Sequence, residues 1–387
     1  MPLRALSVAV VGAGIGGLAA ALSLRRVGMY VRVFERAPEI KEVGAGLGVW
    51  ANAVRILDRL GAGEAIRAVA QPMERAGIFS RRGRALSLMD MREFSRALGV
   101  SSFVMHRTAL QKALLSLLPA EVVSTGFQCV GLHRRGGKVE LQFKDRPPFE
   151  ADLVVGADGF HSVIRRNLFG ETATRFSGQT CYRGVVRMTV KHPGLLAEFQ
   201  GTGQRLGHCP FAKDRMYWFA CHNAAPNEPE DTRGAKVKLV EMFAGWPYAM
   251  EEVIAATPDE SIIRSDLSDR VPLKTWGADH VTLLGDAAHP MLPNLGQGAC
   301  TAIEDGAVLA QCLTQAETVD AALRNYEARR IPRTTRLVTL SWRFGIAARW
   351  TNPLAVRCRE AILKATPENL ARQELMRQVG YDAFQTP

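Results

Sequence analysis

The stretch VAVVGAGIGGLAAALSLRRVGMYVRVFER, residues 8–36, decides the fold of this chain. Its apolar start predicts a short strand over residues 7–11. The apolar pattern that follows predicts a helix from about residue 16 to residue 27, and then a second strand over residues 30–34 that ends at Glu35. A strand, a helix and a strand in this order are typical of a parallel sheet covered by helices.

Three glycines lie where the first predicted strand turns into the helix. Gly12 permits the tight turn, Gly14 lets backbone N–H groups approach a pyrophosphate, and Gly17 lets the helix pack closely on the strand. The helix N-terminus adds a partial positive charge. Glu35, roughly twenty residues on, is placed to accept hydrogen bonds from an adenosine ribose. The pattern therefore predicts dinucleotide binding, and the alternative is a glycine-rich turn in an ordinary strand–helix–strand unit.

The composition is that of a globular protein large enough for two domains. The chain has 387 residues, of which 47% are hydrophobic and 22% charged. The apolar run after Arg4 resembles a secretory signal, but five glycines between Gly12 and Gly28 argue against one. No window holds eighteen uninterrupted apolar residues, so we expect no stable membrane insertion and a cytoplasmic protein.

The seven cysteines are scattered, odd in number and without a CxxC pair. This usage suits free thiols in a reducing compartment and shows no metal-site spacing. Cys209 and Cys221, each beside a histidine (His208 and His222), could suggest zinc. We expect these residues on two successive strands of a sheet instead, and we predict no metal.

The net charge of +11 is concentrated near the C-terminus. Residues 329–377 hold eleven Arg or Lys against three Glu, a surplus of eight. Three interpretations compete: a solvated basic face, attraction of anionic cofactors or membrane lipid, and nucleic-acid binding. The sequence contains no nucleic-acid-binding motif, so we expect no such partner and favour a solvated face that steers anions.

Two later segments repeat the pattern of an apolar strand followed by glycine, an acid and a helix. DLVVGADGFHSVIRRNLFG, residues 152–170, places Asp158 after the strand. HVTLLGDAAHPMLPNLGQGACTAIEDGAVLAQCL, residues 280–313, places Asp286 there, and a loop with His289 then leads to a long helix. We interpret His289 as a loop histidine bonded to backbone.

The parts of the chain between and before these segments show a different sequence pattern. Residues 180–268 alternate as antiparallel strands and predict a second, sheet-based domain, with aromatic residues that either line a cavity or fill its core. We also expect a flexible loop around Gly44, Gly46 and Gly48, one strand over residues 122–132, and a helix capped by Thr108.

Taken together, the three glycine–acid segments resemble those of the FAD-dependent aromatic hydroxylases of the para-hydroxybenzoate hydroxylase fold, the single-component flavoprotein monooxygenases. The resemblance spans about residues 7–335 and is nearest to the branch of urate, 6-hydroxynicotinate and salicylate hydroxylases and zeaxanthin epoxidases. It implies an α/β fold: a Rossmann-like FAD-binding domain with a parallel sheet and helices, a mostly antiparallel sheet substrate domain, and C-terminal helices. The implied FAD-binding domain comprises residues 1–72, 100–176 and 272–335, the substrate domain residues 73–99 and 177–271, and the helical region residues 336–387.

The resemblance also implies roles for individual residues. The cofactor-binding residues it implies are Gly12, Gly14, Gly17, Glu35, Arg36, Gly48, Arg107, Val130, Asp158, Asp286, Gly296, Gln297, Gly298, Ala299 and Cys300. Val130 would contact the adenine through its backbone, and Pro293 lies in the loop that faces the flavin C4a. The implied substrate residues are Arg205, Tyr217 and Cys181, with a surface arginine as the alternative for Arg205. This chain has Cys181-Tyr182-Arg183-Gly184 where the urate branch has Asn-Trp-Asn-Gly, which puts urate in doubt as the substrate.

The expected activity is hydroxylation of an aromatic or heteroaromatic small molecule with NADH or NADPH and O2, through a flavin C4a-hydroperoxide. The helix after Gly298 would stabilise the negative charge of reduced flavin through its dipole. Residues 201–207 lack the third glycine of a second nucleotide fold, so NAD(P)H is expected to bind transiently. The alternatives are an epoxidase that acts on an apolar alkene near a membrane and a flavin-binding protein without turnover. A monomer and a homodimer both remain open.

Overall fold

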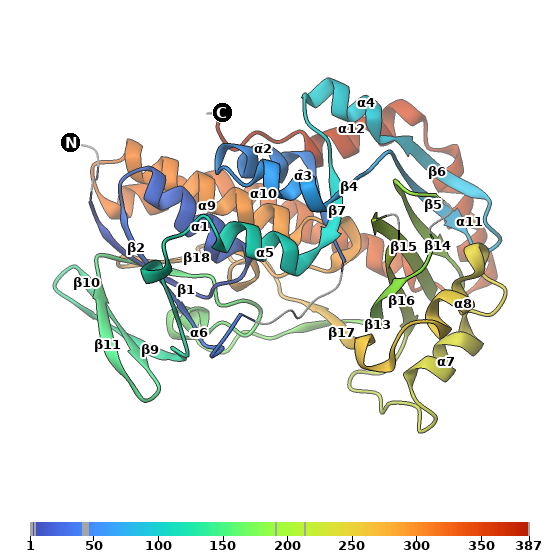
Figure 1. Cartoon of the computed structure of the whole chain (residues 1–387), viewed down its shortest axis with the longest axis horizontal. Coiled ribbons are helices and arrows are strands. Elements are labelled where there is room, and N and C mark those ends of the chain that lie inside the picture. Colours follow the sequence, from blue (N-terminus) through green and yellow to red (C-terminus); the bar gives the residue numbers. More distant parts are fainter. Residues whose placement is uncertain (1–2, 4, 41–45, 190–191, 213, 386–387) are drawn as a thin grey trace.

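The structure is a computed structural model that describes residues 3, 5–40, 46–189, 192–212 and 214–385. It contains a five-stranded sheet, a seven-stranded sheet and two smaller sheets, with helices around them (Figure 1). The expected fold class is confirmed: a parallel sheet with helices, a mostly antiparallel sheet and C-terminal helices. Gly44, which belongs to the predicted glycine loop, lies outside the described residues.

The five-stranded sheet is fully parallel and begins with the segment that opens the chain. Its strands lie in the order β18 (Val281–Leu283), β12 (Leu153–Gly156), β1 (Ser7–Val11), β2 (Tyr30–Glu35) and β8 (Val123–Thr125). The apolar residues of β1, β12 and β18 are buried, which is why these strands are continuous apolar runs. Their carboxyl ends meet at one edge of the sheet, and all three glycine–acid turns therefore lie together there.

Helices α1 (Ile15–Arg26) and α9 (Gly298–Gln315) pack against each other beside this sheet (Figure 1). The approach is close because Gly306 of α9 has no side chain: a Cβ there would lie 2.7 Å from the Cα of Ala20. Near β12 lie α6 (Val163–Phe169) and a small sheet of β9 (Cys129–Arg135), β10 (Lys138–Phe143) and β11 (Arg146–Ala151). The segment predicted as one strand over residues 122–132 thus divides into β8 and β9, which belong to different sheets.

The seven-stranded sheet is antiparallel except for one parallel pair, β14 with β5. Its strands lie in the order β17 (Ile263–Asp269), β13 (Arg175–Arg187), β16 (Arg215–Asn223), β15 (Gln204–Ala212), β14 (Leu195–Gln200), β5 (Arg75–Ser80) and β6 (Ala85–Asp90). Helices α7 (Ala235–Met242) and α8 (Met250–Ala255) supply buried residues to the core on one face of this sheet. That core includes Tyr182 and Trp218, so these two aromatic residues do not line a cavity.

A three-stranded sheet and four shorter helices connect the two large sheets. The sheet consists of β3 (Gly46–Val49), β7 (Phe103–His106) and β4 (Gln71–Pro72), and the helices are α2 (Ala51–Arg59), α3 (Gly63–Val69), α4 (Met91–Leu98) and α5 (Arg107–Leu115). The prediction of a loop at Gly46 and Gly48 is wrong, because these residues pair with β7. The prediction that Thr108 caps this helix is wrong as well. His106 is the N-cap residue of α5, and the Thr108 hydroxyl lies 2.6 Å from Nδ1 of His106.

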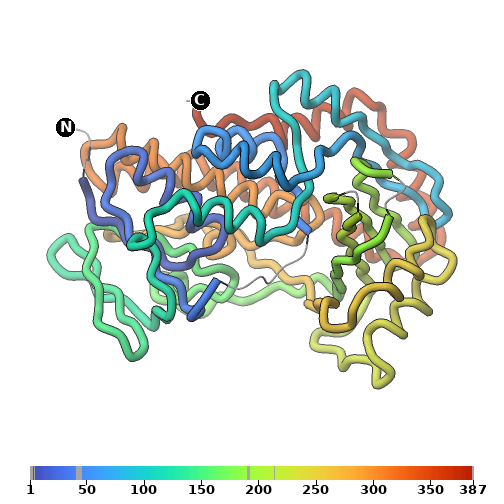
Figure 2. The backbone as a smooth tube through the Cα atoms, viewed as in Figure 1, coloured from blue at the N-terminus to red at the C-terminus, as the bar shows by residue number. Residues whose placement is uncertain are grey.

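Three helices complete the chain: α10 (Val319–Ala348), α11 (Pro353–Ala365) and α12 (Glu368–Val379). Figure 2 shows this part crossing from the parallel sheet to the seven-stranded sheet and then turning back. Between α10 and α11 the helix is interrupted, and the Asn352 side chain caps α11 by accepting from the amides of residues 354 and 355. The prediction of a solvated basic face is wrong for two of its members, because Arg330 and Arg359 are buried.

In the described part of the chain, no helix is both long enough and apolar enough to cross a membrane.

Candidate active site

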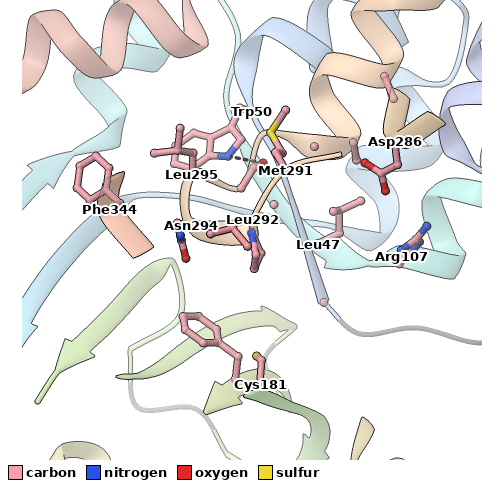
Figure 3. A pocket seen from close by; sticks show the side chains of 18 of the residues that line it. Leu47, Trp50, Arg107, Cys181, Asp286, Met291, Leu292, Asn294, Leu295 and Phe344 are labelled. Carbon is pink, nitrogen blue, oxygen red and sulfur yellow. Dashed lines mark hydrogen bonds between the residues drawn. The ribbon is translucent and has the colours of Figure 1, made fainter. Parts of the chain in front are cut away.

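A single cavity of about 1170 Å3 runs from the glycine–acid edge of the parallel sheet to the seven-stranded sheet. One end is lined by residues of the first segment, and the other by side chains of β13 to β16. The loop at residues 291–296 (Figure 3) and the first turn of α9 lie between these ends. Faces of α10, α11 and α12 form a further wall. The cavity therefore joins all three glycine–acid segments to the second sheet.

The first end of the cavity is built by the turn after β1. Gly12 has φ +107°, and a Cβ there would lie 2.5 Å from the carbonyl oxygen of Ala157, so only glycine fits. Gly14 differs, because a Cβ at this position meets no protein atom within 4 Å. It faces the cavity, as do Glu35 and Arg36. Gly17 does not line the cavity and packs against the carbonyl of Gly12, so its place in the structure is a packing position.

The Glu35 carboxylate holds this turn in place. Its Oε2 accepts a hydrogen bond from the amide of Ala13 at 2.8 Å, and its Oε1 accepts one from the amide of Ala37 at 2.9 Å. Each carboxylate oxygen has a second lone pair, so the group can still accept from a ligand in the cavity.

Glu35→Ala is expected to weaken FAD binding at least about 10-fold, because hydrogen bonds to a charged group contribute about 1.5–3 kcal/mol each. FAD affinity is measured by titrating the apoprotein and following flavin fluorescence. Glu64→Ala, an exposed acid in the first turn of α3, serves as the control. Unchanged affinity of Glu35→Ala would contradict the assignment of Glu35 to the ribose.

Two aspartates follow strands of the same sheet and face the cavity. The Asp158 carboxylate caps α6 by accepting from the Ser162 hydroxyl at 2.5 Å and the amide of Val163 at 2.7 Å. The side chain of Asp286 is open to the cavity, opposite Arg107 (Figure 3). The surrounding protein raises the pKa of the Asp286 carboxyl by desolvation, although His289 and Arg107 oppose this.

The loop and the first turn of α9 present mostly backbone and apolar groups to the middle of the cavity. Gly296 has φ +62°, and its carbonyl accepts a hydrogen bond from the Trp50 indole at 3.1 Å (Figure 3). Gly298 and Ala299 line the cavity at the helix N-terminus, and Pro293 lines it from the loop. An N-terminus of an α-helix in this position favours negative charge in the cavity.

Some of the predicted cofactor residues do not reach the cavity wall. Gln297 is buried behind it and accepts a hydrogen bond from Asn52 at 3.0 Å, while Cys300 is buried and accepts from the backbone amide of Trp50 at 3.4 Å. Val130 is 50% exposed and does not line the cavity, whereas its neighbours Gln128 and Cys129 do. The proposed backbone contact of Val130 with adenine stays a prediction.

A buried network of charges supports this wall from behind. His289 Nε2 lies 2.6 Å from Asp305 Oδ2, so the expectation that His289 bonds to backbone is wrong. The same oxygen accepts the amide of Gly285 at 3.0 Å, next to Asp286. Burial would raise the pKa of Asp305, but His289 and Arg330 outweigh it and lower the pKa to about 2. Asp305 was not predicted as a site residue, because an acidic residue within a helical pattern is common and does not by itself indicate a buried ion pair.

The seven-stranded sheet contributes the other end of the cavity through the alternation of its side chains. On β16, Tyr217, Phe219 and Cys221 face the cavity, while Trp218 and Ala220 face α7 and α8. The neighbouring strands follow the same register, and their cavity-facing residues include Cys181, Arg183, Glu198, Gln200, Arg205 and Cys209. Phe211, by contrast, is buried without lining the cavity.

Arg205 is the most deeply buried cation of this end. It is 3% exposed, so the alternative of a surface arginine is wrong. Its Nη1 lies 3.6 Å from Glu198 Oε1 and its Nη2 lies 3.7 Å from Cys221 Sγ, which are long contacts. Its Nε is buried without a hydrogen-bond partner among the described residues. A buried guanidinium with unused donors suits a ligand with acceptor oxygens or nitrogens.

The described residues contain no group of three or more His, Cys, Asp or Glu that could hold a metal ion. Cys209 and Cys221 lie on the successive strands β15 and β16, as expected, and line the cavity. His208 lies on the opposite side of the sheet, where its ring contacts Phe199 and Tyr248.

Comparisons with known proteins agree with this arrangement. Residues 5–341 match the model of the family described as FAD binding domain. The chain is 36% identical to aurachin C monooxygenase/isomerase of Stigmatella aurantiaca over 360 residues, which are 93% of this chain and 94% of that protein. It is 35% identical to 3-amino-4-hydroxybenzoate 2-monooxygenase of Streptomyces cremeus, over 86% and 85% of the two chains. The structure of Klebsiella pneumoniae HpxO complexed with FAD and uric acid matches with a TM-score of 0.90 at 27% identity, over 97% of this chain and 96% of that one.

Proposed function

The chain belongs to the FAD binding domain family, whose relatives here are flavin-dependent monooxygenases and hydroxylases, and we propose that it hydroxylates an aromatic or heteroaromatic small molecule with NADH or NADPH and O2. One observation carries this proposal. A single cavity joins a dinucleotide-type turn, a helix N-terminus and a sheet face that holds a buried, under-partnered arginine. A cofactor at one end and a planar substrate at the other would meet at the loop that contains Pro293.

The residues present fit FAD. A side chain at Gly14 would occupy empty space that faces the cavity, so the protein itself does not require glycine there and a ligand explains it better. Gly12, Gly14, Glu35 and Arg36 would hold the ADP half. Arg107 and Asp286 would hold the middle of the cofactor, and the turn from Gly296 to Ala299 its flavin end. When bound, FAD supplies the redox chemistry that activates O2.

The chain's own residues would provide binding, orientation and electrostatics. The N-terminus of α9 favours negative charge at the flavin end. Trp50, Leu47 and Met291 line the middle of the cavity with apolar surface and keep water away from the reacting atoms. Arg205, Tyr217 and Cys181, which line the same end of the cavity, would bind and orient the substrate ring, and Pro293 would shape the wall next to it.

We propose further that the two large sheets belong to two domains, one that binds FAD and one that binds the substrate. Residues 1–72, 100–176 and 272–335 would form the FAD-binding domain, and residues 73–99 and 177–271 would form the substrate domain. This division is supported by β5 and β6, which join the seven-stranded sheet although they precede it by many residues. Residues 336–387 would then close the cavity with helices. An aromatic small molecule would be the partner, with NAD(P)H bound only transiently.

The proposal is tested by screening phenolic and heteroaromatic acids against the purified holoprotein. NADH and NADPH oxidation should rise with one of the compounds, and mass spectrometry should find one added oxygen in the ring. An epoxide product would favour the epoxidase reading instead. A yellow protein that never oxidises NAD(P)H faster with any compound would be a flavin-binding protein without turnover.

Arg205→Met is expected to raise the KM for an anionic substrate about 10-fold or more, because charge-assisted hydrogen bonds contribute about 1.5–3 kcal/mol each. The initial rate of substrate-stimulated NAD(P)H oxidation measures this change. Arg215→Met, an exposed arginine on the adjacent strand β16, is the matched control and should leave KM unchanged. Equal KM values for the two variants would show that Arg205 does not bind substrate.

A further inference from the structure

Two cysteines of the cavity wall lie directly opposite each other on neighbouring strands. Cys181 of β13 pairs in register with Cys221 of β16. Both border the cavity, both are only 1% exposed when surface facing the cavity is included, and both belong to one small buried cluster. Figure 3 shows Cys181 beneath the loop of Leu292 and Asn294. The pair therefore lies at the cavity wall, next to the space that a small molecule in the cavity would occupy.

The ladder between β13 and β16 shows what kind of pair the cysteines form. Beyond one end of the ladder the amide of Ala224 donates to the carbonyl of Gly178 at 3.2 Å, and beyond the other end the amide of Met188 donates to the carbonyl of Asp214 at 3.0 Å. Both are hydrogen-bonded pairs, and the register is unbroken between them. Hydrogen-bonded and non-hydrogen-bonded pairs alternate along an antiparallel ladder, so the cysteines, three residues from one end, form a non-hydrogen-bonded pair.

This geometry suits a covalent link. In a non-hydrogen-bonded pair the Cα atoms lie about 4.5 Å apart and the side chains approach most closely. Disulfides span Cα distances of roughly 4.4–6.8 Å. The two strands already hold the cysteines at the required separation, so a bond between them would need rotation of side chains rather than movement of backbone.

The surroundings make one of the two thiols reactive. A hydrogen bond from Cys221, together with the positive charges of Arg183 and Arg205, lowers the pKa of Cys181 to about 6 against the effect of burial. The pKa of Cys221 lies well above its usual value, because that thiol donates to Cys181 and is buried. The thiolate is the nucleophilic form of cysteine, and the lowered pKa favours Cys181 as the attacking sulfur, with Cys221, whose Sγ accepts from Arg205 Nη2 at 3.7 Å, as the resolving one.

We propose that Cys181 and Cys221 are a modification site in the substrate end of the cavity, which a hydroperoxide such as hydrogen peroxide converts to a disulfide. The Cys181 thiolate attacks one peroxide oxygen, the O–O bond breaks, and hydroxide leaves and takes a proton from solvent. The sulfenic acid on Cys181 is then attacked by the Cys221 sulfur, the S–O bond breaks and water leaves with the Cys221 proton. Two electrons pass from the thiols to the peroxide, and a dithiol reductant reverses the change.

Oxidation would alter the substrate end, since Cys221 Sγ lies 3.7 Å from Arg205 Nη2. A disulfide removes the thiol and the thiolate that lie near Arg183 and Arg205, and substrate affinity should then change. Only this consequence rests on the proposed function. Formation of the disulfide does not, because added peroxide serves as the oxidant whether or not the protein turns over.

The experiment treats the purified holoprotein with stoichiometric hydrogen peroxide, blocks the remaining thiols with N-ethylmaleimide in denaturant, and maps the digest by mass spectrometry. We expect a cross-linked peptide pair that contains Cys181 and Cys221 and disappears on treatment with dithiothreitol. Cys209 is the matched comparison, since it lines the same cavity opposite Tyr217 and burial raises its pKa to about 12. Cys181 should react at least about 10-fold faster than Cys209.

Two variants keep the test decisive even if one folds poorly. Cys221→Ser should stop at the Cys181 sulfenic acid, which dimedone traps, whereas Cys209→Ser should still form the cross-link. Retained flavin absorbance and an unchanged thermal midpoint show that each variant is folded. Over-oxidation of Cys181 without a cross-link, equal oxidation of Cys209, or two thiols that stay reduced would each overturn the proposal.

Discussion

Replacing Gly14 with valine is expected to abolish tight FAD binding while the apoprotein keeps its fold. Gly14 is the N-cap residue of α1 with φ −68° and ψ 175°, an extended conformation that any residue adopts. A Cβ at this position meets no protein atom within 4 Å. The added methyl groups would instead fill the space through which backbone amides approach a pyrophosphate.

The expected loss of FAD affinity is roughly 100-fold or more, because several charge-assisted hydrogen bonds of about 1.5–3 kcal/mol each would be broken together. Fluorescence titration of the apoprotein measures the affinity, and thermal unfolding of the apoprotein measures the fold. Gly17→Ala is the contrasting variant. Its Cβ would clash with the carbonyl oxygen of Gly12, so the apoprotein itself should be destabilised. If Gly14→Val binds FAD as tightly as the parent chain, the assignment of this turn to the cofactor is wrong.

Arg330→Met is expected to lower the free energy of unfolding by about 3–5 kcal/mol, since it removes the buried cation that two buried carboxylates share, although Glu304 keeps Arg333 and Asp305 keeps His289. Arg330 of α10 is completely buried. Its Nη2 lies 2.7 Å from Glu304 Oε2, and its Nε lies 2.7 Å from Asp305 Oδ1. Both carboxylates belong to α9, and Asp305 in turn holds His289 and the amide of Gly285. The loss should therefore also weaken FAD binding through the turn that carries Asp286.

Urea unfolding monitored by circular dichroism measures the change in stability. Arg336, like Arg330, belongs to α10, and it forms an exposed ion pair with Glu374 of α12. Arg336→Met removes this pair and should lower the free energy of unfolding by less than about 1 kcal/mol. Arg330→Lys is a second comparison, because a lysine keeps the charge but loses the planar fork that contacts both carboxylates. Similar unfolding midpoints for Arg330→Met and Arg336→Met would contradict a structural role for the buried network.

Much of the fold could be predicted from the sequence because its signals are local. Apolar runs that stop at glycine mark the parallel strands β1, β12 and β18, and alternation marks the strands that follow Thr180. These patterns depend on neighbouring residues and on the period of the element. The predictions that failed concern segments whose secondary structure depends on pairing with a strand far away in the sequence. Gly46 and Gly48 form a strand only because β7 lies beside them.

The candidate site was only partly predictable for the same reason. The proposed cofactor residues at strand ends, such as Asp286 and Glu35, follow from spacing because the carboxyl ends of parallel strands meet at one edge. The position of Arg205 inside the cavity depends on the register of β15 with β14 and β16. A shift by one residue would turn that side chain to the other face of the sheet.

By itself, the sequence determined the dinucleotide turn, the order of strands and helices, and the family to which the chain belongs. Only the tertiary structure decided which charges are buried together and which thiols face each other. Arg330 meets Asp305 across two packed helices, and Cys181 meets Cys221 across forty residues of chain. Such pairs are set by the packing of helices and the register of strands, and these depend on the free energy of the whole core rather than on any short segment.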